Sequence, residues 1–338
     1  MAFGQRLYPI QYNRMPRRQR AHLPPLVVLW LVLLGGLACQ SPSTHGLYLS
    51  MRHTYYEPAL EPLERWSIRR RLDTLYPELG IVEPNTGVLR DHAGKVRVEL
   101  LSEQTSPLLQ KLKNLPQAHQ ARFHQHIQVV PWVFVEGLDP KRSILLQLDF
   151  YDSVQRQKLL EVIRALHLLG FSGVHLDVEP LFSSQVPALC SFLEEVRQQT
   201  SPQFLRSLFT PKLLPSTLSG EVRHPDQVHP GFMWDSLELF EQLTQCSDEL
   251  VVPLYDYGSL VQTPAQYQRW VRETAQSLQH LPFYTTRIKL ALPAYRLTAQ
   301  HSAAESAALA LPLLQKKELA PAGVVYFQFT GEKADWWP

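Results

Sequence analysis

Three ionisable side chains, His175, Asp177 and Glu179, are spaced two residues apart between the chain-breaking residues Gly170 and Pro180. The residues between them are apolar, which is typical of a short buried strand. Because side chains alternate across a strand, the three ionisable groups share one face. Such a row is costly to bury unless it lines a solvated or catalytic cavity. The stretch therefore predicts the floor of an active site.

The elements that would position this strand alternate between short apolar runs and segments of helical period. We expect strands at 46–50, 127–135, 171–179, 205–214, 250–255, 288–293 and 323–329, and one more within 78–101, where 96–100 alternates beside turn signals. We expect helices at 60–76, 103–124, 152–169, 187–199, 235–246, 263–281 and 303–317. Eight alternating units favour an α/β fold, a (β/α)₈ TIM barrel, with a doubly wound open sheet as the second candidate.

In such a barrel, catalytic groups come from the C-terminal ends of several strands, and the polar residues of these runs lie there. The predicted site collects Asp177 and Glu179 from the fourth strand, Tyr255 and Asp256 from the sixth, Tyr295 and Arg296 from the seventh, and Gln328 from the eighth. Trp132 and Trp234 are candidate sugar-stacking platforms, because an aromatic face suits the apolar face of a pyranose. An aromatic in a strand or long loop is more often part of the core.

Three segments resemble glycoside hydrolase family 18, the chitinase family, and lie in the family's order. Residues 171–179 resemble its fourth-strand signature, apolar-Asp-Gly-x-Asp-x-Asp-x-Glu, with Asp177 on the last Asp and Glu179 on the Glu. Residues 248–258 resemble its sixth-strand Met-x-Tyr-Asp segment, with Tyr255 and Asp256 on the functional pair. Residues 289–295 resemble its seventh-strand Leu-Pro-x-Tyr, with Tyr295 as the tyrosine.

The resemblance implies a retaining, substrate-assisted hydrolysis of a glycan that carries N-acetylamino sugars, such as chitin or peptidoglycan. Glu179 would protonate the glycosidic oxygen as general acid, and Asp177 would orient the acetamido group that attacks the anomeric carbon. Tyr255 would hold the acetamido carbonyl. The reaction needs no cofactor and no metal. We expect His175, Asp256, Tyr295, Arg296, Gln328, Trp132 and Trp234 to contact substrate.

Four departures from the family pattern leave a second function open. Ser172 and His175 stand where the family has Asp, the third strand lacks Ser-x-Gly-Gly, and Phe327 stands where a Trp is usual. A catalytically inactive barrel that binds glycan is therefore an alternative. A lower-ranked alternative is a metal-dependent hydrolase in which His175, Asp177 and Glu179 are ligands.

The first residues predict export. Four arginines between Arg14 and Arg20 precede an apolar run at 26–38 that is short for a transmembrane helix and ends in small residues. The end of this run, Gly36 to Cys39, resembles a bacterial lipobox with Cys39 as the lipidated residue; a plain signal peptide or an uncleaved anchor is the alternative. We expect a signal at 1–38, a tether at 39–45 and one glycosidase-like barrel at 46–338, on an outer-membrane lipoprotein that faces the periplasm or the cell surface.

Composition limits the partners. The chain has 338 residues with 33 Lys and Arg against 31 Asp and Glu, so its formal net charge of +2 gives no support for nucleic-acid binding. We expect a glycan substrate and a membrane contact through the lipid at Cys39. The other two cysteines, Cys190 and Cys246, fit either a disulfide or two buried thiols.

Overall fold

The residues that the structure describes all fall within Ser41–Pro338. The structure is a computed structural model, and it describes residues 45–49, 72–82, 89–90, 107–123, 126–135, 137–139, 144–146, 148–178, 181–213, 234–235, 237–255, 263–281, 287–293, 309–310, 312–314 and 323–329. The predicted signal, the tether apart from His45 and the predicted lipidation site Cys39 lie outside these residues. None of the described helices is long and apolar enough to cross a membrane.

Eight parallel strands form a closed ring. In ring order they are β1 (His45–Leu49), β2 (Leu72–Val82), β5 (Trp132–Val135), β8 (Gly173–Val178), β9 (Leu205–Phe209), β12 (Glu249–Pro253), β13 (Arg287–Pro293) and β14 (Gly323–Phe329). The short strand β4 (Gln128–Val129) extends the third position of the ring, where Pro131 interrupts the ladder. Because β1 pairs with both β2 and β14, the sheet has no open edge, so the predicted TIM barrel is confirmed and an open doubly wound sheet is excluded.

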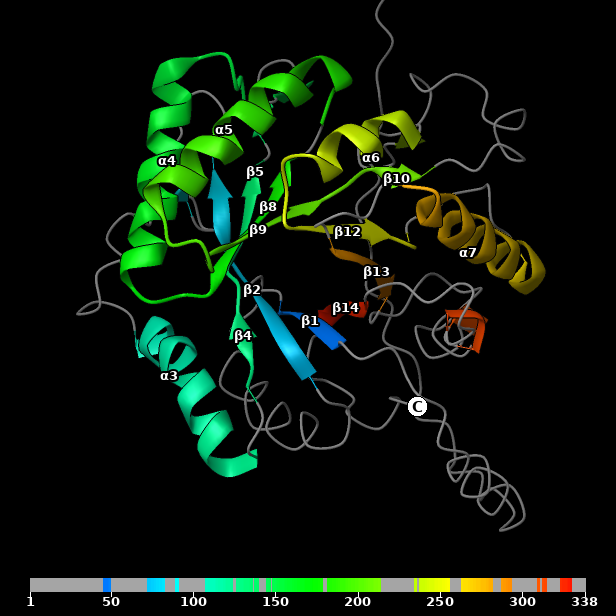
Figure 1. Ribbon diagram of the computed structural model, residues 1–338, viewed down its shortest axis with the longest axis horizontal. Helices are drawn as coiled ribbons and strands as arrows, with labels where there is room; N and C mark the ends of the chain where they lie inside the picture. The colour runs from blue at the N-terminus through cyan, green and yellow to red at the C-terminus, as the bar shows by residue number, and fades with distance from the viewer. Residues whose placement is uncertain are drawn as a thin grey trace, which may run out of the picture. The chain divides into compact units, whose positions relative to one another are not determined.

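The described helices lie outside the ring (Figure 1). They include α3 (Pro107–Phe123), α4 (Ser153–Leu168), α5 (Val186–Gln199), α6 (Leu237–Thr244) and α7 (Pro264–Gln279), with a 3₁₀ turn at Ser183–Gln185. Residues 309–310 and 312–314 are also helical, within the helix predicted over 303–317. Asp152 caps α4 by accepting from the amides of Val154 and Gln155, and Thr263 begins α7 with a complete capping box. After α4, Gly170 has a φ of 86°, a left-handed conformation that glycine adopts at little cost, and the chain turns there into β8.

The two faces of the barrel strands pack into two different apolar cores. The larger core lies between strands and helices, and it takes Val174, Leu176 and Val178 from β8. The smaller core lies inside the ring and is largely aromatic; its members are Tyr48, Tyr76, Val130, Trp132, Phe134, Leu205, Phe209, Val251, Tyr255, Ala291 and Val325. Alternation along β8 therefore points His175 and Asp177 into the barrel, as the sequence predicts.

The second strand lies where the sequence predicts the end of a helix. The prediction of a helix over 60–76 is wrong for its last residues, since β2 begins at Leu72. Leu72, Leu75 and Leu79 have helical spacing, yet nearly all of β2 is buried on both faces, so its sequence does not alternate as a half-buried strand would. The short strand β3 (Leu89–Arg90) pairs antiparallel with the end of β2, within the range 78–101 where the sequence predicts one more strand. The predicted strand at 96–100 is outside the described residues.

Two further strand pairs lie off the ring. The antiparallel strands β6 (Gly137–Asp139) and β7 (Ile144–Leu146) form a hairpin in the connection that follows β5. The parallel strands β10 (Lys212–Leu213) and β11 (Trp234–Asp235) pair beyond the end of β9. The strand predicted over 205–214 is therefore divided between β9 and β10, and the helix predicted from residue 235 begins two residues later, at Leu237.

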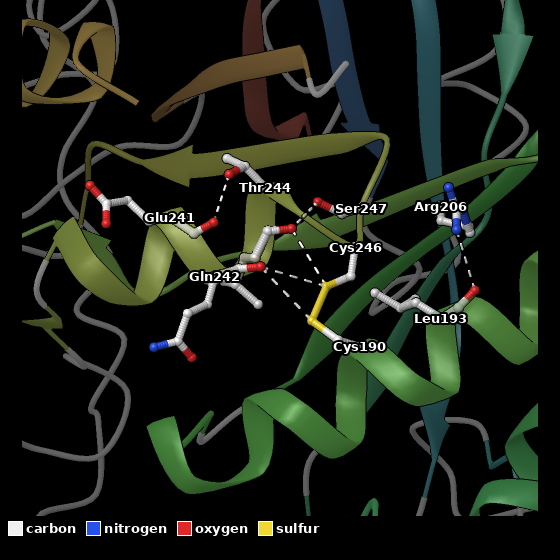
Figure 2. The surroundings of a disulfide bond; sticks show 9 residues. Cys190, Leu193, Arg206, Glu241, Gln242, Thr244, Cys246 and Ser247 are labelled. Atoms are coloured by element: carbon white, nitrogen blue, oxygen red, sulfur yellow. Dashed lines mark hydrogen bonds between the residues drawn. A yellow bond between two sulfur atoms is a disulfide. The ribbon is translucent and has the colours of Figure 1, made fainter. Parts of the chain in front are cut away.

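Cys190 and Cys246 form a disulfide. Figure 2 shows the bond joining α5 to the turn that follows α6, with the carbonyl oxygen of Gln242 within 3.9 Å of both sulfur atoms. The Cα atoms are 5.2 Å apart, within the ordinary range for a disulfide. Of the two arrangements compatible with the sequence, the structure has the covalent one, which fastens two consecutive outer helices together.

Candidate active site

The structure places three of the predicted site residues in the interior of the barrel at or near strand ends. Asp177 is the penultimate residue of β8, and Tyr255 follows the end of β12; they are 2% and 3% exposed. Trp132 begins β5 and is 4% exposed. Glu179, Asp256, Tyr295 and Arg296 lie outside the described residues, and the side chains of Gln328 in β14 and Trp234 in β11 do too.

The Asp177 carboxylate is held by an indole. Trp132 Nε1 donates a hydrogen bond of 3.1 Å to Asp177 Oδ2 across the β5–β8 pair. On the other side of β8, Asp177 is in register with Phe209, whose ring stacks on Tyr255 with centroids 6.3 Å apart. Asp177 and Tyr255 therefore both lie next to Phe209, Asp177 by strand register and Tyr255 by ring stacking. Trp132 also makes edge-on ring contacts with Tyr48 and Phe134, and its predicted role as a stacking platform stays a prediction.

Below Asp177, His175 is fully buried and both of its ring nitrogens have protein partners. Nε2 lies 2.6 Å from the Tyr48 hydroxyl, and Nδ1 lies 2.7 Å from Ser207 Oγ. The rings of Tyr48 and Tyr76 approach His175 edge-on, with centroids 5.2 and 5.0 Å from the imidazole. Burial lowers the pKa of His175 to about 3, and Lys289 adds to this while Glu249 opposes it. His175 is therefore neutral wherever the protein is folded near neutral pH.

A buried ion pair lies at the end of this network. Glu249 and Lys289 are 0% and 1% exposed, and Lys289 Nζ lies 3.1 Å from Glu249 Oε2. Ser207 Oγ and the Tyr76 hydroxyl both donate to Glu249 Oε1, at 2.9 and 2.5 Å. Burial opposes ionisation of the Glu249 carboxyl, but Lys289, the Tyr76 hydroxyl, Arg287 and the Ser207 hydroxyl outweigh it and hold the Glu249 pKa below its ordinary value. Glu249 is thus a buried anion.

The two tyrosines stay protonated. Burial raises the pKa of Tyr48 well above its ordinary value, with Asp177 and Glu249 adding to the shift. Burial also raises the pKa of Tyr76, with Glu249 the next largest cause. Both hydroxyls are consequently hydrogen-bond donors at any pH at which the protein is used.

Most of the hydrogen-bond network around His175 was not predicted from the sequence. Its overlooked members are Tyr48, Tyr76, Ser207, Glu249 and Lys289. A charged residue within an apolar strand was the available signal: Glu249 opens the run Leu250 to Leu254, and Lys289 stands between Ile288 and Leu290. Only the barrel register brings them together, since His175, Ser207 and Glu249 are direct neighbours on three consecutive strands of the ring.

Within the described ranges, no group of three His, Cys, Asp or Glu side chains is arranged to hold a metal ion. Glu179 lies outside those ranges, so the proposed ligand set of His175, Asp177 and Glu179 is not tested as a whole. Two of its members already have other partners: both nitrogens of His175 are hydrogen-bonded within the protein, and Asp177 accepts from Trp132. In this arrangement the neutral, hydrogen-bonded imidazole of His175 precedes the buried Asp177 carboxylate along the inward face of β8.

Comparison with solved structures finds the same fold in chitinases and in a spore cortex-lytic enzyme. A GH18 chitinase from Pseudoalteromonas aurantia matches with a TM-score of 0.54 and 17% identity, over 87% of this chain and 97% of that one. The spore cortex-lytic enzyme SleL of Bacillus megaterium QM B1551 has a TM-score of 0.55 and 14% identity, over 87% and 72%. A chitinase from Bacteroides thetaiotaomicron has a TM-score of 0.52 and 12% identity, over 86% and 91%.

At these identities the likeness establishes the fold alone, which is the barrel of the GH18 chitinase and of SleL. No protein-family model matches the sequence, and no curated protein matches it. The resemblance read from the three sequence segments therefore agrees with the fold of the whole unit.

Proposed function

We propose that the chain is a glycoside hydrolase that acts on a glycan containing N-acetylamino sugars, of the chitin or peptidoglycan type. The observation that carries this proposal is the placement of Asp177: it is buried at the C-terminal end of the fourth barrel strand, bonded to Trp132, and precedes Glu179 by two residues. The similar barrels of a chitinase and of a cortex-lytic enzyme support the same substrate class.

In the proposed reaction Glu179 is the general acid that protonates the leaving oxygen and later activates water. Asp177 orients the acetamido group of the substrate, which attacks the anomeric carbon in place of a protein nucleophile. The Trp132 hydrogen bond supports this role, because it fixes one carboxylate oxygen and so the orientation of the carboxylate. Tyr255 is assigned to the acetamido carbonyl.

The test is release of sugar from N-acetylglucosamine oligomers and from peptidoglycan fragments by the purified full-length chain. We expect wild-type protein to release product, and Glu179→Gln and Asp177→Asn each to lower kcat by at least about a hundredfold while glycan binding persists. Glu194→Gln is the matched control, since Glu194 is an exposed partner of Arg197 on α5. Equal rates for Glu179→Gln and Glu194→Gln would refute the assignment.

One observation favours a second function, glycan binding without hydrolysis. His175, which stands where the family motif has a carboxylate, is neutral in this barrel, and its two nitrogens are committed to Tyr48 and Ser207. A barrel that binds the oligomers and releases no sugar from either glycan, with no difference between wild type and Glu179→Gln, would establish this alternative.

We also propose that the chain is an exported lipoprotein anchored through Cys39 in the outer membrane. The Cys190–Cys246 disulfide supports export, because disulfides persist in oxidising compartments and are rare in a reducing cytosol. Metabolic labelling with a radioactive fatty acid tests the anchor. We expect wild-type protein to be labelled and to sediment with outer membranes, and Cys39→Ser to remain unlabelled; labelling of Cys39→Ser would exclude this site.

A further inference from the structure

The hydrogen bonds below Asp177 have one direction. Glu249 is ionised and accepts only, so the single hydrogen of the Ser207 hydroxyl is donated to Glu249 Oε1 at 2.9 Å. Ser207 Oγ then has only lone pairs for His175 Nδ1, 2.7 Å away, so Nδ1 carries the ring hydrogen. A neutral imidazole protonated at Nδ1 has a lone pair at Nε2. The Tyr48 hydroxyl, 2.6 Å from Nε2, must therefore donate to it.

The cation fixes the other side of the same network. The Lys289 ammonium donates to Thr74 Oγ1 at 3.0 Å and to the Tyr76 oxygen at 3.2 Å, and it forms an ion pair with Glu249 Oε2, 3.1 Å away. Tyr76 gives its own hydrogen to Glu249, and Thr74 gives its hydrogen to Asp73. Reversing the direction of any of these hydrogen bonds would place two buried donors, or a buried anion and a lone pair, against each other. Either arrangement leaves a buried polar group unsatisfied.

We propose that the Glu249–Lys289 pair, acting through Ser207, holds His175 as the neutral Nδ1–H tautomer and so commits the Tyr48 hydroxyl as a donor to His175. The consequence concerns Asp177. On the inward face of β8 the neighbour of Asp177 is His175, and both ring nitrogens of His175 are already hydrogen-bonded. The hydroxyl hydrogen of Tyr48 points toward His175 and away from the Asp177 carboxylate. His175 therefore cannot accept a proton from Asp177. The residues that hold His175 in this state act as positioning residues for the site; they are Tyr48, Tyr76, Ser207, Glu249 and Lys289.

Among the residues that the structure describes, five charged or titratable groups face His175. They are Tyr48 from β1, Tyr76 from β2, Glu249 from β12, Lys289 from β13 and, on β8 itself, Asp177. On β5, Trp132 is in register with His175, and from β9 the Ser207 hydroxyl and the ring of Phe209 contact it. The burial that keeps the ring neutral acts together with this arrangement.

Long-range ¹⁵N–¹H spectra of the histidine-labelled full-length chain test the tautomer directly. The chain has 13 histidines, and the His175 signals are those missing from His175→Gln. We expect a protonated, pyrrole-type Nδ1 and an unprotonated, pyridine-type Nε2, unchanged between about pH 5 and pH 8. Observation of the Nε2–H tautomer, or of a doubly protonated ring in that range, would overturn the proposal.

Two substitutions test the relay. In Ser207→Ala the Nδ1 hydrogen loses its acceptor, so we expect the ring to change to the Nε2–H tautomer and donate to Tyr48. In Glu249→Gln the new amide donates to Ser207, which then donates to Nδ1, and the same change of tautomer is expected even though Ser207 is intact. Thr210→Val is the matched control, because Thr210 lies just beyond β9 and its hydroxyl bonds only the Val251 carbonyl; it should retain the Nδ1–H form.

If Glu249→Gln does not fold, Ser207→Ala alone decides the question. A folded Ser207→Ala protein that keeps the Nδ1–H tautomer would show that Ser207 does not transmit it. The proposal deepens the proposed glycosidase function and depends on it for one readout alone: a fall in kcat of about tenfold to a hundredfold in Ser207→Ala, without a change in KM. The tautomer can be measured whether or not the chain releases sugar, so failure of the function and failure of this proposal are separate results.

Discussion

Lys289 Nζ lies 3.1 Å from Glu249 Oε2 inside the barrel, with both side chains almost fully excluded from solvent. Removing one residue of a buried ion pair destabilises the fold far more than removing both, because the remaining charge is buried without a counter-charge. We expect Lys289→Met to lower the free energy of unfolding by about 3–5 kcal/mol. Urea unfolding at pH 7 measures the change.

The double variant Lys289→Met/Glu249→Gln is the control for this pair. It removes both charges, so it should be more stable than Lys289→Met alone, and the two substitutions should be strongly non-additive. Additive losses would mean that the two side chains do not interact, in contradiction to the short distance between them.

Trp132→Phe should affect Asp177 specifically. The substitution keeps an aromatic ring in the interior cluster but removes the N–H that donates to Asp177 Oδ2. We expect a loss of about 1–3 kcal/mol in unfolding free energy, the usual cost of a buried acceptor without its donor, and a slower release of sugar from N-acetylglucosamine oligomers. Unfolding curves and initial rates measure the two effects.

Trp270→Phe is the comparison, since the Trp270 indole is equally buried but donates to the carbonyl of Leu213. It should lose stability while keeping the rate of wild type. Equal losses of rate in Trp132→Phe and Trp270→Phe would show that the indole bond to Asp177 has no part in the reaction.

The fold was predictable because segments of helical period alternate with short apolar runs, and two of the helices, α4 and α7, also begin at capping residues. The second strand was not, since Leu72, Leu75 and Leu79 have helical spacing although they lie in a strand that is buried on both faces. The two-residue spacing of His175 and Asp177 correctly predicted that both side chains lie on the same face of the strand, inside the barrel. The relay below them was hidden, because Ser207, Glu249 and Lys289 are separated along the chain and meet only through strand register.

Removal of the disulfide should destabilise the barrel without affecting the site. Cys190 and Cys246 are 56 residues apart, and closing a loop of that length in the unfolded chain corresponds to about 4 kcal/mol in the chain-entropy description. We therefore expect Cys190→Ser/Cys246→Ser to unfold at a lower denaturant concentration with an unchanged His175 tautomer. Reduction of wild-type protein should reproduce the shift, and reduction of the double variant should have no further effect.

Gly173→Ala should be among the most destabilising small changes in the fourth strand. A Cβ at Gly173 would overlap the backbone oxygen of Leu205 on the neighbouring strand and lie 2.6 Å from its Cβ. Because a strand backbone cannot withdraw as a side-chain tip can, we expect a loss of about 3 kcal/mol or more. Gly170→Ala is the control: its Cβ would meet nothing closer than 4.0 Å, and only its positive φ is unfavourable, at about 1–2 kcal/mol. Similar unfolding free energies for the two variants would contradict the close approach of β8 and β9.

His175 should make the stability of the protein depend on pH in a defined window. Burial depresses its pKa from 6.5 to about 3, so between these values the unfolded chain binds a proton that the folded chain does not. Stability from this residue is therefore complete above about pH 6.5 and is lost as the pH falls toward 3, by about 1.4 kcal/mol per pH unit. His175→Gln cannot titrate, so a plot of its unfolding free energy against pH should be flatter than that of wild type by this slope between pH 6 and pH 4. Parallel plots for the two proteins would show that His175 is not held neutral in the folded barrel.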